Sequence, residues 1–342
     1  MIVRGNGWFS TRGIAALLLV AGCGGCAWLH KGEKSPYDLE SRFRGHTVAM
    51  AGTQPRVSAD ASDDVTEASR TMSSEELERR GDAYMSRGSL QVAYMQYEKA
   101  LRLEPGSVGL HCKKGMVCLL GGVWEEAVKE FEEALKKEPH NALAHEGMGQ
   151  ALFFMKRYDE AQGYLSKALE YERSLWKCHA LLGIISDYKG DHRAAADQYR
   201  AALALRPDNG ALYNNLGVSC LMAADYAGAI EAFSSALDRG FSESKLYNNL
   251  GTALFLAGRD KEALEAFSKA GDRTQAYNNL GCMYLKRGDR QRAAECFGRA
   301  LELRPTFYAK AHENLQRCRL ASGGLDPDQG YDERPGLLDR PQ

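Results

Sequence analysis

The feature that most constrains this chain is a pentapeptide that occurs three times. The sequence Tyr-Asn-Asn-Leu-Gly begins at Tyr213, Tyr247 and Tyr277, at intervals of 34 and 30 residues. Periods of this length are typical of proteins built from stacked units, each of which buries its apolar face against its neighbours. We therefore expect a row of stacked repeats rather than a domain with one central core.

Small and aromatic residues follow the pentapeptide at constant distances. An alanine lies twelve residues after the glycine, a phenylalanine four residues later and a second alanine three residues after that. The frame extends back to Gly81, although Leu165 replaces the aromatic residue in the third repeat and four residues are missing near Gly271 in the sixth. We expect local irregularity at both places. The seven repeats span residues 74–107, 108–141, 142–175, 176–209, 210–243, 244–273 and 274–307.

This spacing resembles that of the tetratricopeptide repeat, a helix-turn-helix unit. The resemblance implies an all-α solenoid, a right-handed superhelix of antiparallel helix pairs. Glycine in the first helix and alanine in the second permit close helix packing, while the aromatic residue fills the gap to the next repeat. Residues 308–321 are expected to form a C-terminal capping helix, and residues 322–342 a disordered tail.

The N-terminus has the features of an export signal. Arg4 and Arg12 precede a short apolar run from Ile14 to Ala21, as in the charged and hydrophobic regions of a secretory signal. Eight apolar residues are too few to span a bilayer, which needs about 20. A transmembrane anchor is therefore the weaker interpretation.

The run ends in Val20-Ala21-Gly22-Cys23, which resembles the lipobox of bacterial lipoproteins. The resemblance implies that the Cys23 thiol carries a diacylglycerol and becomes the first residue of the mature protein. Residues 1–22 are then the signal peptide and residues 23–73 a lipidated, flexible tether. The alternative is an ordinary signal peptide followed by a cysteine that is there by chance.

The remaining composition argues against chemistry in the repeats. A net charge of −1 offers no basic field for nucleic acid. No nucleophile, metalloprotease or phosphate-binding motif is present, so we expect no catalytic residue, metal site, cofactor or small-molecule substrate. Seven cysteines are scattered without paired spacing and are expected to pack as small apolar side chains. They are Cys112, Cys118, Cys178, Cys220, Cys282, Cys296 and Cys318.

The resemblance also implies where a partner binds. In tetratricopeptide repeats the concave face is lined mainly by positions 2, 5, 9, 12 and 13 of each repeat, with position 6 often contributing. Position 5 supplies Asn214, Asn248 and Asn278, whose amides could bind an extended peptide backbone. Position 6 supplies Asn215, Asn249 and Asn279, for which a purely structural role is the alternative.

Positions 12 and 13 provide an apolar stripe that predicts contact with an amphipathic helix or apolar peptide. The alternative is that all of these residues belong to the core. No lysine or arginine stands at position 5, so the clamp that some members use for a C-terminal carboxylate is absent. The candidate residues are Phe153, Phe154, Tyr188, Leu221, Met222, Phe255 and Leu256.

Lipobox, tether and repeats together resemble the TadD-type lipoproteins of the tight-adherence (Flp) pilus system. The resemblance implies a membrane-anchored interaction scaffold that assists assembly of a pilus or secretion complex. Gly24 after the cysteine favours the periplasmic face of the outer membrane. The alternatives are an adaptor that recruits cell-wall hydrolases, or a cytosolic adaptor if the lipobox is accidental.

Overall fold

The computed structural model describes residues 72–303 and 309–320, and within these ranges it contains helices and no strand. The predicted all-α repeat fold is confirmed. The expected signal peptide, most of the tether and the tail lie outside the described residues, and so does Cys23. None of the described helices is long and apolar enough to cross a membrane.

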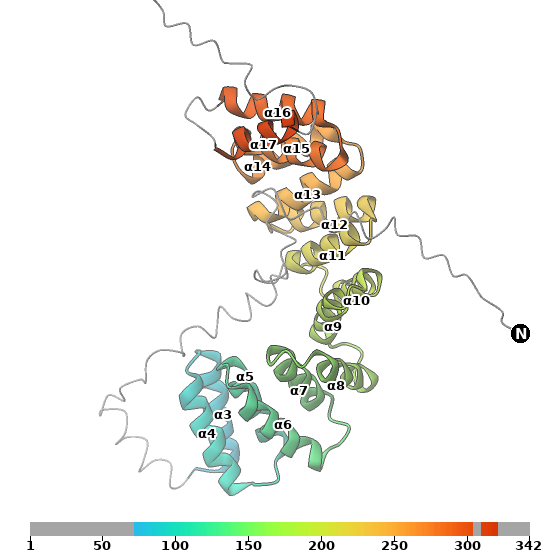
Figure 1. Cartoon of the computed structure of the whole chain (residues 1–342). Helices are drawn as coiled ribbons and strands as arrows, with labels where there is room; N and C mark the ends of the chain where they lie inside the picture. The colour runs from blue at the N-terminus through green and yellow to red at the C-terminus, as the bar shows by residue number, and fades with distance from the viewer. Residues whose placement is uncertain (1–71, 304–308, 321–342) are drawn as a thin grey trace, which may run out of the picture. The chain divides into compact units, whose positions relative to one another are not determined.

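The described chain divides into two compact units, which meet in sequence between Phe241 and Ser242. The N-terminal unit consists of five helix pairs, and consecutive helices pack against each other (Figure 1). They are α3 (Ser74–Ser86), α4 (Leu90–Leu103), α5 (Val108–Leu120), α6 (Trp124–Lys137), α7 (Ala142–Phe154), α8 (Tyr158–Tyr171), α9 (Trp176–Tyr188), α10 (His192–Leu205), α11 (Gly210–Met222) and α12 (Tyr226–Asp238).

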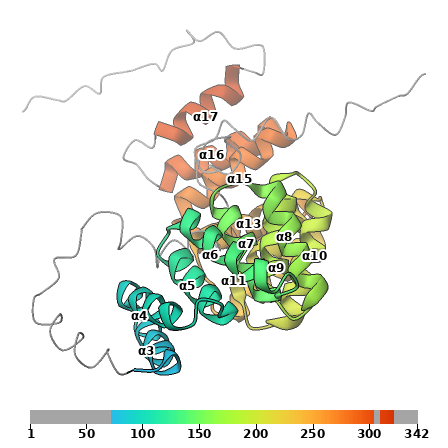
Figure 2. The same cartoon turned by 90° about the horizontal axis from the view of Figure 1, so that it is seen from below.

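The C-terminal unit contains two helix pairs and one further helix. In this unit α17 packs against α16 and α15 (Figures 1 and 2). It buries Ala311, Asn314 and Cys318. A helix therefore covers the last pair, at the place where the sequence predicts a cap. The helices are α13 (Ser244–Leu256), α14 (Asp260–Ala270), α15 (Arg273–Arg287), α16 (Arg290–Leu303) and α17 (Ala309–Leu320).

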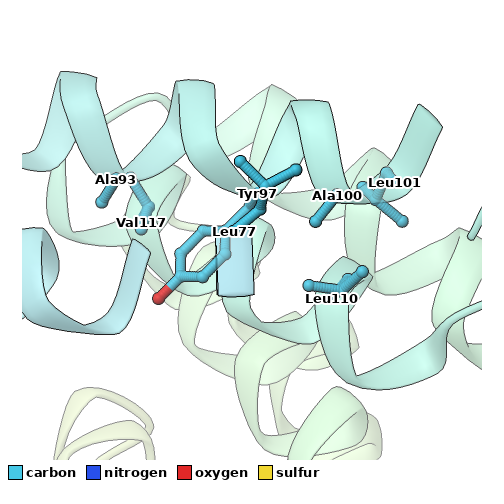
Figure 3. Close-up of a cluster of buried hydrophobic side chains, with 7 residues drawn as sticks. All are labelled: Leu77, Ala93, Tyr97, Ala100, Leu101, Leu110 and Val117. Carbon is cyan, nitrogen blue, oxygen red and sulfur yellow. The ribbon is translucent and has the colours of Figure 1, made fainter. Parts of the chain in front are cut away.

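The recurring glycine meets the aromatic residue within six of the seven helix pairs, and in the third pair Gly149 meets Leu165. A Cβ atom added to Gly217 would lie 2.6 Å from the Phe233 ring, so only glycine allows α11 and α12 this spacing. In the first repeat the Tyr97 ring packs against Gly81 and joins a cluster of buried residues from α3, α4 and α5 (Figure 3). Burying one large side chain per pair against small residues, a ring in six repeats and Leu165 in the third, thus fixes the helix spacing in the same way in each repeat.

The turns within the helix pairs need a left-handed residue. Glycine takes this conformation in five of the seven pairs, at residues 88, 122, 190, 258 and 288. Lys156 and Ala224 take it in the third and fifth pairs, with φ of 63° and 62°. These two turns carry strain that glycine would avoid. The third repeat is otherwise regular. Its second helix, α8, has 14 residues and ends at Tyr171. Leu165 is fully buried in the position that an aromatic residue occupies in the other repeats.

The shortened sixth repeat has a local structural solution. Its second helix, α14, is 11 residues long and ends before Gly271. Asp272 then caps the next helix by accepting a hydrogen bond of 2.7 Å from the backbone N–H of Gln275. The missing residues are therefore taken from the end of α14 and the linker, and α15 begins directly after the cap.

Candidate functional site

The asparagines of the C-terminal unit form hydrogen bonds from one repeat to the next. Asn279 in α15 donates from Nδ2 to Oδ1 of Asn248 in α13, at 3.2 Å. Asn314 in α17 donates in the same way to Oδ1 of Asn278, at 3.3 Å. These amides thus tie α13 to α15 and α15 to α17, and part of their hydrogen-bonding capacity is used inside the protein.

Burial separates the two sets of predicted asparagines. Asn215 has an exposed fraction of 0%, and neither its Nδ2 nor the buried Nδ2 of Asn249 has a hydrogen-bond partner among the described residues. Their burial favours the structural interpretation of position 6. At position 5, Asn214 and Asn278 are buried as well, whereas Asn248 is half-buried and keeps an edge toward solvent.

An aromatic row runs across the second, third and fourth repeats. Trp124 stacks on Phe154 with ring centroids 5.9 Å apart, and Tyr158 stacks on Tyr188 at 4.9 Å. Phe153 links the two pairs, because its ring lies 5.6 Å from both Phe154 and Tyr158. Tyr188 is 41% exposed, whereas Phe153 is buried with 3% exposed. The row thus combines a buried centre with rings that reach the surface.

Trp124 and Tyr158 were not predicted to belong to this site. Both occupy the first residue of a second helix, α6 or α8, and each stacks on position 13 of the following repeat. The sequence carries a signal for this, since an aromatic residue also opens α12 at Tyr226. The signal is meaningful only once the stacking between repeats is known.

The other predicted apolar residues do not share one environment. Leu221 and Met222 are half-buried, and Leu256 is 42% exposed. Phe255 is 2% exposed and lies beneath the guanidinium of Arg287, with 4.4 Å between Cζ and the ring centroid. Phe153 and Phe255, at position 12, therefore pack inside the protein. The exposed side chains of this apolar stripe stand at position 13.

A network of charges in the first two repeats was not predicted. Lys113 pairs with Glu78 at 2.7 Å and with Asp82 at 2.6 Å. The neighbouring Lys114 is buried between Glu98 and Glu130, at 3.0 Å from Glu130. Burial alone would lower the pKa of Lys114, but the hydrogen bonds to these two carboxylates outweigh it and raise the pKa. These pairs join α3, α4, α5 and α6, and they balance the positive charge of each lysine with carboxylates.

Glu146 is the buried carboxylate of the third repeat. It lies at position 5 of α7 and accepts a hydrogen bond of 3.0 Å from Nε2 of Gln150. Burial raises its pKa, and the positive charge of Lys177 opposes that rise. No group of three or more metal-ligating side chains occurs in the part of the chain that the structure describes.

Asp187, His192 and Ser219 meet in the fourth and fifth repeats. Nδ1 of His192 lies 2.8 Å from Oδ1 of Asp187, and the Ser219 hydroxyl donates to Oδ2 at 2.7 Å. Both neighbours contact the carboxylate, so the histidine is not placed to take a proton from the hydroxyl, as a nucleophilic triad requires. The arrangement satisfies a buried carboxylate and connects α9, α10 and α11.

Three family models match the repeat region, and each is described as a tetratricopeptide repeat. One matches residues 121–182, the second residues 181–244 and 225–277, and the third residues 274–307. Together they cover residues 121–307, which is more than half of the chain. No curated protein matches the chain.

Three solved structures illustrate the similarity of the fold. A tetratricopeptide repeat protein from Parabacteroides merdae is 17% identical, with a TM-score of 0.47, and the match covers 72% of this chain and 98% of that one. YrrB, titled a TPR protein with an unusual peptide-binding site, is 21% identical over 55% and 99%, with a TM-score of 0.46. MamA from Desulfovibrio magneticus RS-1 is 23% identical over 48% and 94%, with a TM-score of 0.45.

Proposed function

Because this chain is a tetratricopeptide-repeat protein, and such repeats are protein-interaction scaffolds, we propose that it is a lipid-anchored scaffold assisting assembly of a pilus or secretion complex. The observation that carries this proposal is the Val20-Ala21-Gly22-Cys23 sequence ahead of the repeats. A lipidated Cys23 would hold the repeats at the periplasmic face of the outer membrane. More than one acyl chain on that residue would make the attachment lasting.

The aromatic row and the half-buried Asn248 support partner binding by the repeats. Stacked rings that reach the surface give a partner large, rigid apolar contacts with little loss of side-chain entropy. We propose that the row, with Leu221 and Met222 farther along the same unit, holds an apolar peptide or amphipathic helix. Asn248, which is half-buried, would bind the backbone of an extended segment in the C-terminal unit, whereas the buried Asn278 would support it from beneath.

Metabolic labelling with palmitate tests the anchor. Wild-type protein should incorporate label and fractionate with membranes, whereas Cys23→Ala should stay unlabelled and leave the membrane fraction. Cys26→Ala is the matched control, because it removes a nearby cysteine that lacks the aliphatic residue three positions upstream. Unlabelled wild-type protein in the cytosol would overturn the lipoprotein proposal and leave a cytosolic adaptor.

Crosslinking in intact cells, followed by purification of the chain from the membrane fraction, identifies the complex. The Cys23→Ala variant, which should leave that fraction, is the negative control. Pilins, secretin subunits or their assembly ATPases as crosslinked partners would support the assembly role. Cell-wall hydrolases in their place would favour the adaptor interpretation. The same crosslinking is repeated with the Tyr188→Ala variant, which removes the exposed end of the aromatic row. This variant should no longer crosslink to the partner.

A further inference from the structure

The turn between α15 and α16 is the most basic turn of the repeat array. Residues 286–292 carry four cations, Lys286, Arg287, Arg290 and Arg292, against the single carboxylate of Asp289. The equivalent turns of the six preceding repeats have net charges between −2 and +1, whereas this turn has +3. We call residues 286–292 the basic turn.

Two arginines of the basic turn are held by aromatic rings. Arg287 places its Cζ 4.4 Å from the ring centroid of Phe255 and 4.9 Å from that of Tyr284. Arg292 also lies over the Tyr284 ring, with its Cζ 5.7 Å from the centroid. A guanidinium stacked on a ring loses little further freedom when it binds, so these groups are pre-organised.

Asp260 orients this cluster without saturating it. Its Oδ2 accepts a 2.7 Å hydrogen bond from the Tyr284 hydroxyl and lies 3.7 Å from a guanidinium nitrogen of both Arg287 and Arg292. Those two distances exceed a hydrogen bond, and although Nε of Arg292 also lies 3.5 Å from Oδ2 of Asp289, both arginines keep N–H donors for a further carboxylate. The side chains of Arg287 and Arg292 are 41% and 57% exposed and thus accessible to a partner.

We propose that the basic turn and its aromatic platform bind an acidic segment of a protein partner. Two guanidinium forks in fixed positions match carboxylates, which accept paired hydrogen bonds from arginine. Charge complementarity is the reason for this choice, since the turn keeps a net positive charge after Asp289 is counted. The site does not depend on Cys23 or on the aromatic row.

An acidic peptide fits this surface better than an anionic membrane. Membrane-binding clusters use four to eight flexible lysines and arginines, each contributing about 1 kcal/mol near the surface. Here the carboxylates of Asp289 and the neighbouring Asp260 lie beside the cations, and two of the four cations are fixed on rings. Fixed and spaced groups favour recognition of a defined peptide over a diffuse attraction to lipid.

Fluorescence anisotropy on the full chain, in a neutral maltoside detergent, tests the proposal. The probe is a fluorescein-labelled peptide of alternating glutamate and glycine, and its control carries glutamine in place of glutamate. Binding of the acidic probe alone is expected. Loss of two exposed ion pairs in Arg287→Gln/Arg292→Gln should weaken it roughly tenfold, and Arg287→Lys should weaken it about threefold by removing one fork.

The matched control is Arg200→Gln/Arg299→Gln, which removes the same charge from exposed arginines paired within α10 and α16. It should bind the probe as wild type does, and thermal melts must show that all variants are folded. Equal binding by Arg287→Gln/Arg292→Gln and wild type would overturn the proposal. Binding to phosphatidylglycerol vesicles without binding to the peptide would do so as well.

The last outcome concerns the chain itself. Residues 321–342 contain five acidic and two basic residues and follow directly after α17. If only a chain ending at Leu320 binds the probe, the occupant of the basic turn is this segment rather than a separate partner. That result would overturn the proposal, whereas equal binding by both chains would support it.

Discussion

The turns of the third and seventh repeats show opposite chemistry at equivalent positions. Position 13 is Phe154 in the third repeat and Lys286 in the seventh, and position 17 is Tyr158 in one and Arg290 in the other. In the N-terminal unit these positions build the aromatic row, and in the C-terminal unit they build the basic turn. The repeat frame needs only its glycine, alanine and aromatic positions for packing, so the turns are free to specialise.

The aromatic row and the basic turn each rest on a buried phenylalanine at the same repeat position. Position 12 is Phe153 beneath the aromatic row and Phe255 beneath Arg287, with exposed fractions of 3% and 2%. In each unit the buried ring contacts a group that reaches the surface. A common core position therefore supports two different edges.

The largest expected effect comes from removing that support. Phe153→Ala and Phe255→Ala should each lower the free energy of unfolding by about 3–5 kcal/mol, because each leaves a cavity in a packed helix pair. Urea denaturation followed by circular dichroism measures the change. The exposed Leu256→Ala, next to Phe255, is the matched control and should cost far less. A small effect for Phe153→Ala but not for Phe255→Ala would show that position 12 does not play the same structural role in the two units.

A smaller effect is expected at the turns themselves. Gly288 has a φ of 87°, so Gly288→Ala should cost about 1–2 kcal/mol, whereas Lys156→Gly should relieve strain and stabilise the third repeat. Met155→Gly is the control, because this neighbour has a φ of −75° and gains nothing from glycine. Denaturation curves for the three variants measure the differences. Destabilisation by Lys156→Gly would show that this turn needs its side chain.

The smallest effect concerns position 5, which is Glu146 in the third repeat and asparagine at 248 and 278 in the sixth and seventh repeats. Burial raises the pKa of Glu146 above the ordinary value of 4.5, so the folded state holds the proton more tightly than the unfolded state does. Its contribution to stability is therefore present at low pH and is lost as pH rises through the folded-state pKa.

Glu146→Gln should accordingly gain stability relative to wild type at neutral pH and lose that advantage below about pH 4.5. Urea denaturation at both pH values measures the difference. Glu132→Gln on the exposed face of α6 is a control for general loss of negative charge. An unchanged difference between the two pH values would show that Lys177 compensates the buried charge fully.

Much of the fold could be predicted from the sequence, because each helix pair depends on contacts between residues close along the chain. Gly217 and Phe233 are 16 residues apart, and their contact sets the spacing of α11 and α12 wherever that pair of residues recurs. The candidate site was harder to predict. Phe153 and Tyr188 share the aromatic row, but their exposure differs because one ring is enclosed by its neighbours.

The sequence by itself determined the repeat frame, the helix pairs and the residues that reach the turns, since spacing alone decides which residues share a helix face. Only the tertiary structure decided how side chains of successive repeats meet. Asn279 bonds Asn248, Lys114 lies between Glu98 and Glu130, and Arg287 stacks on Phe255. These contacts depend on the stacking of one repeat on the next and on side-chain direction, which no linear spacing specifies.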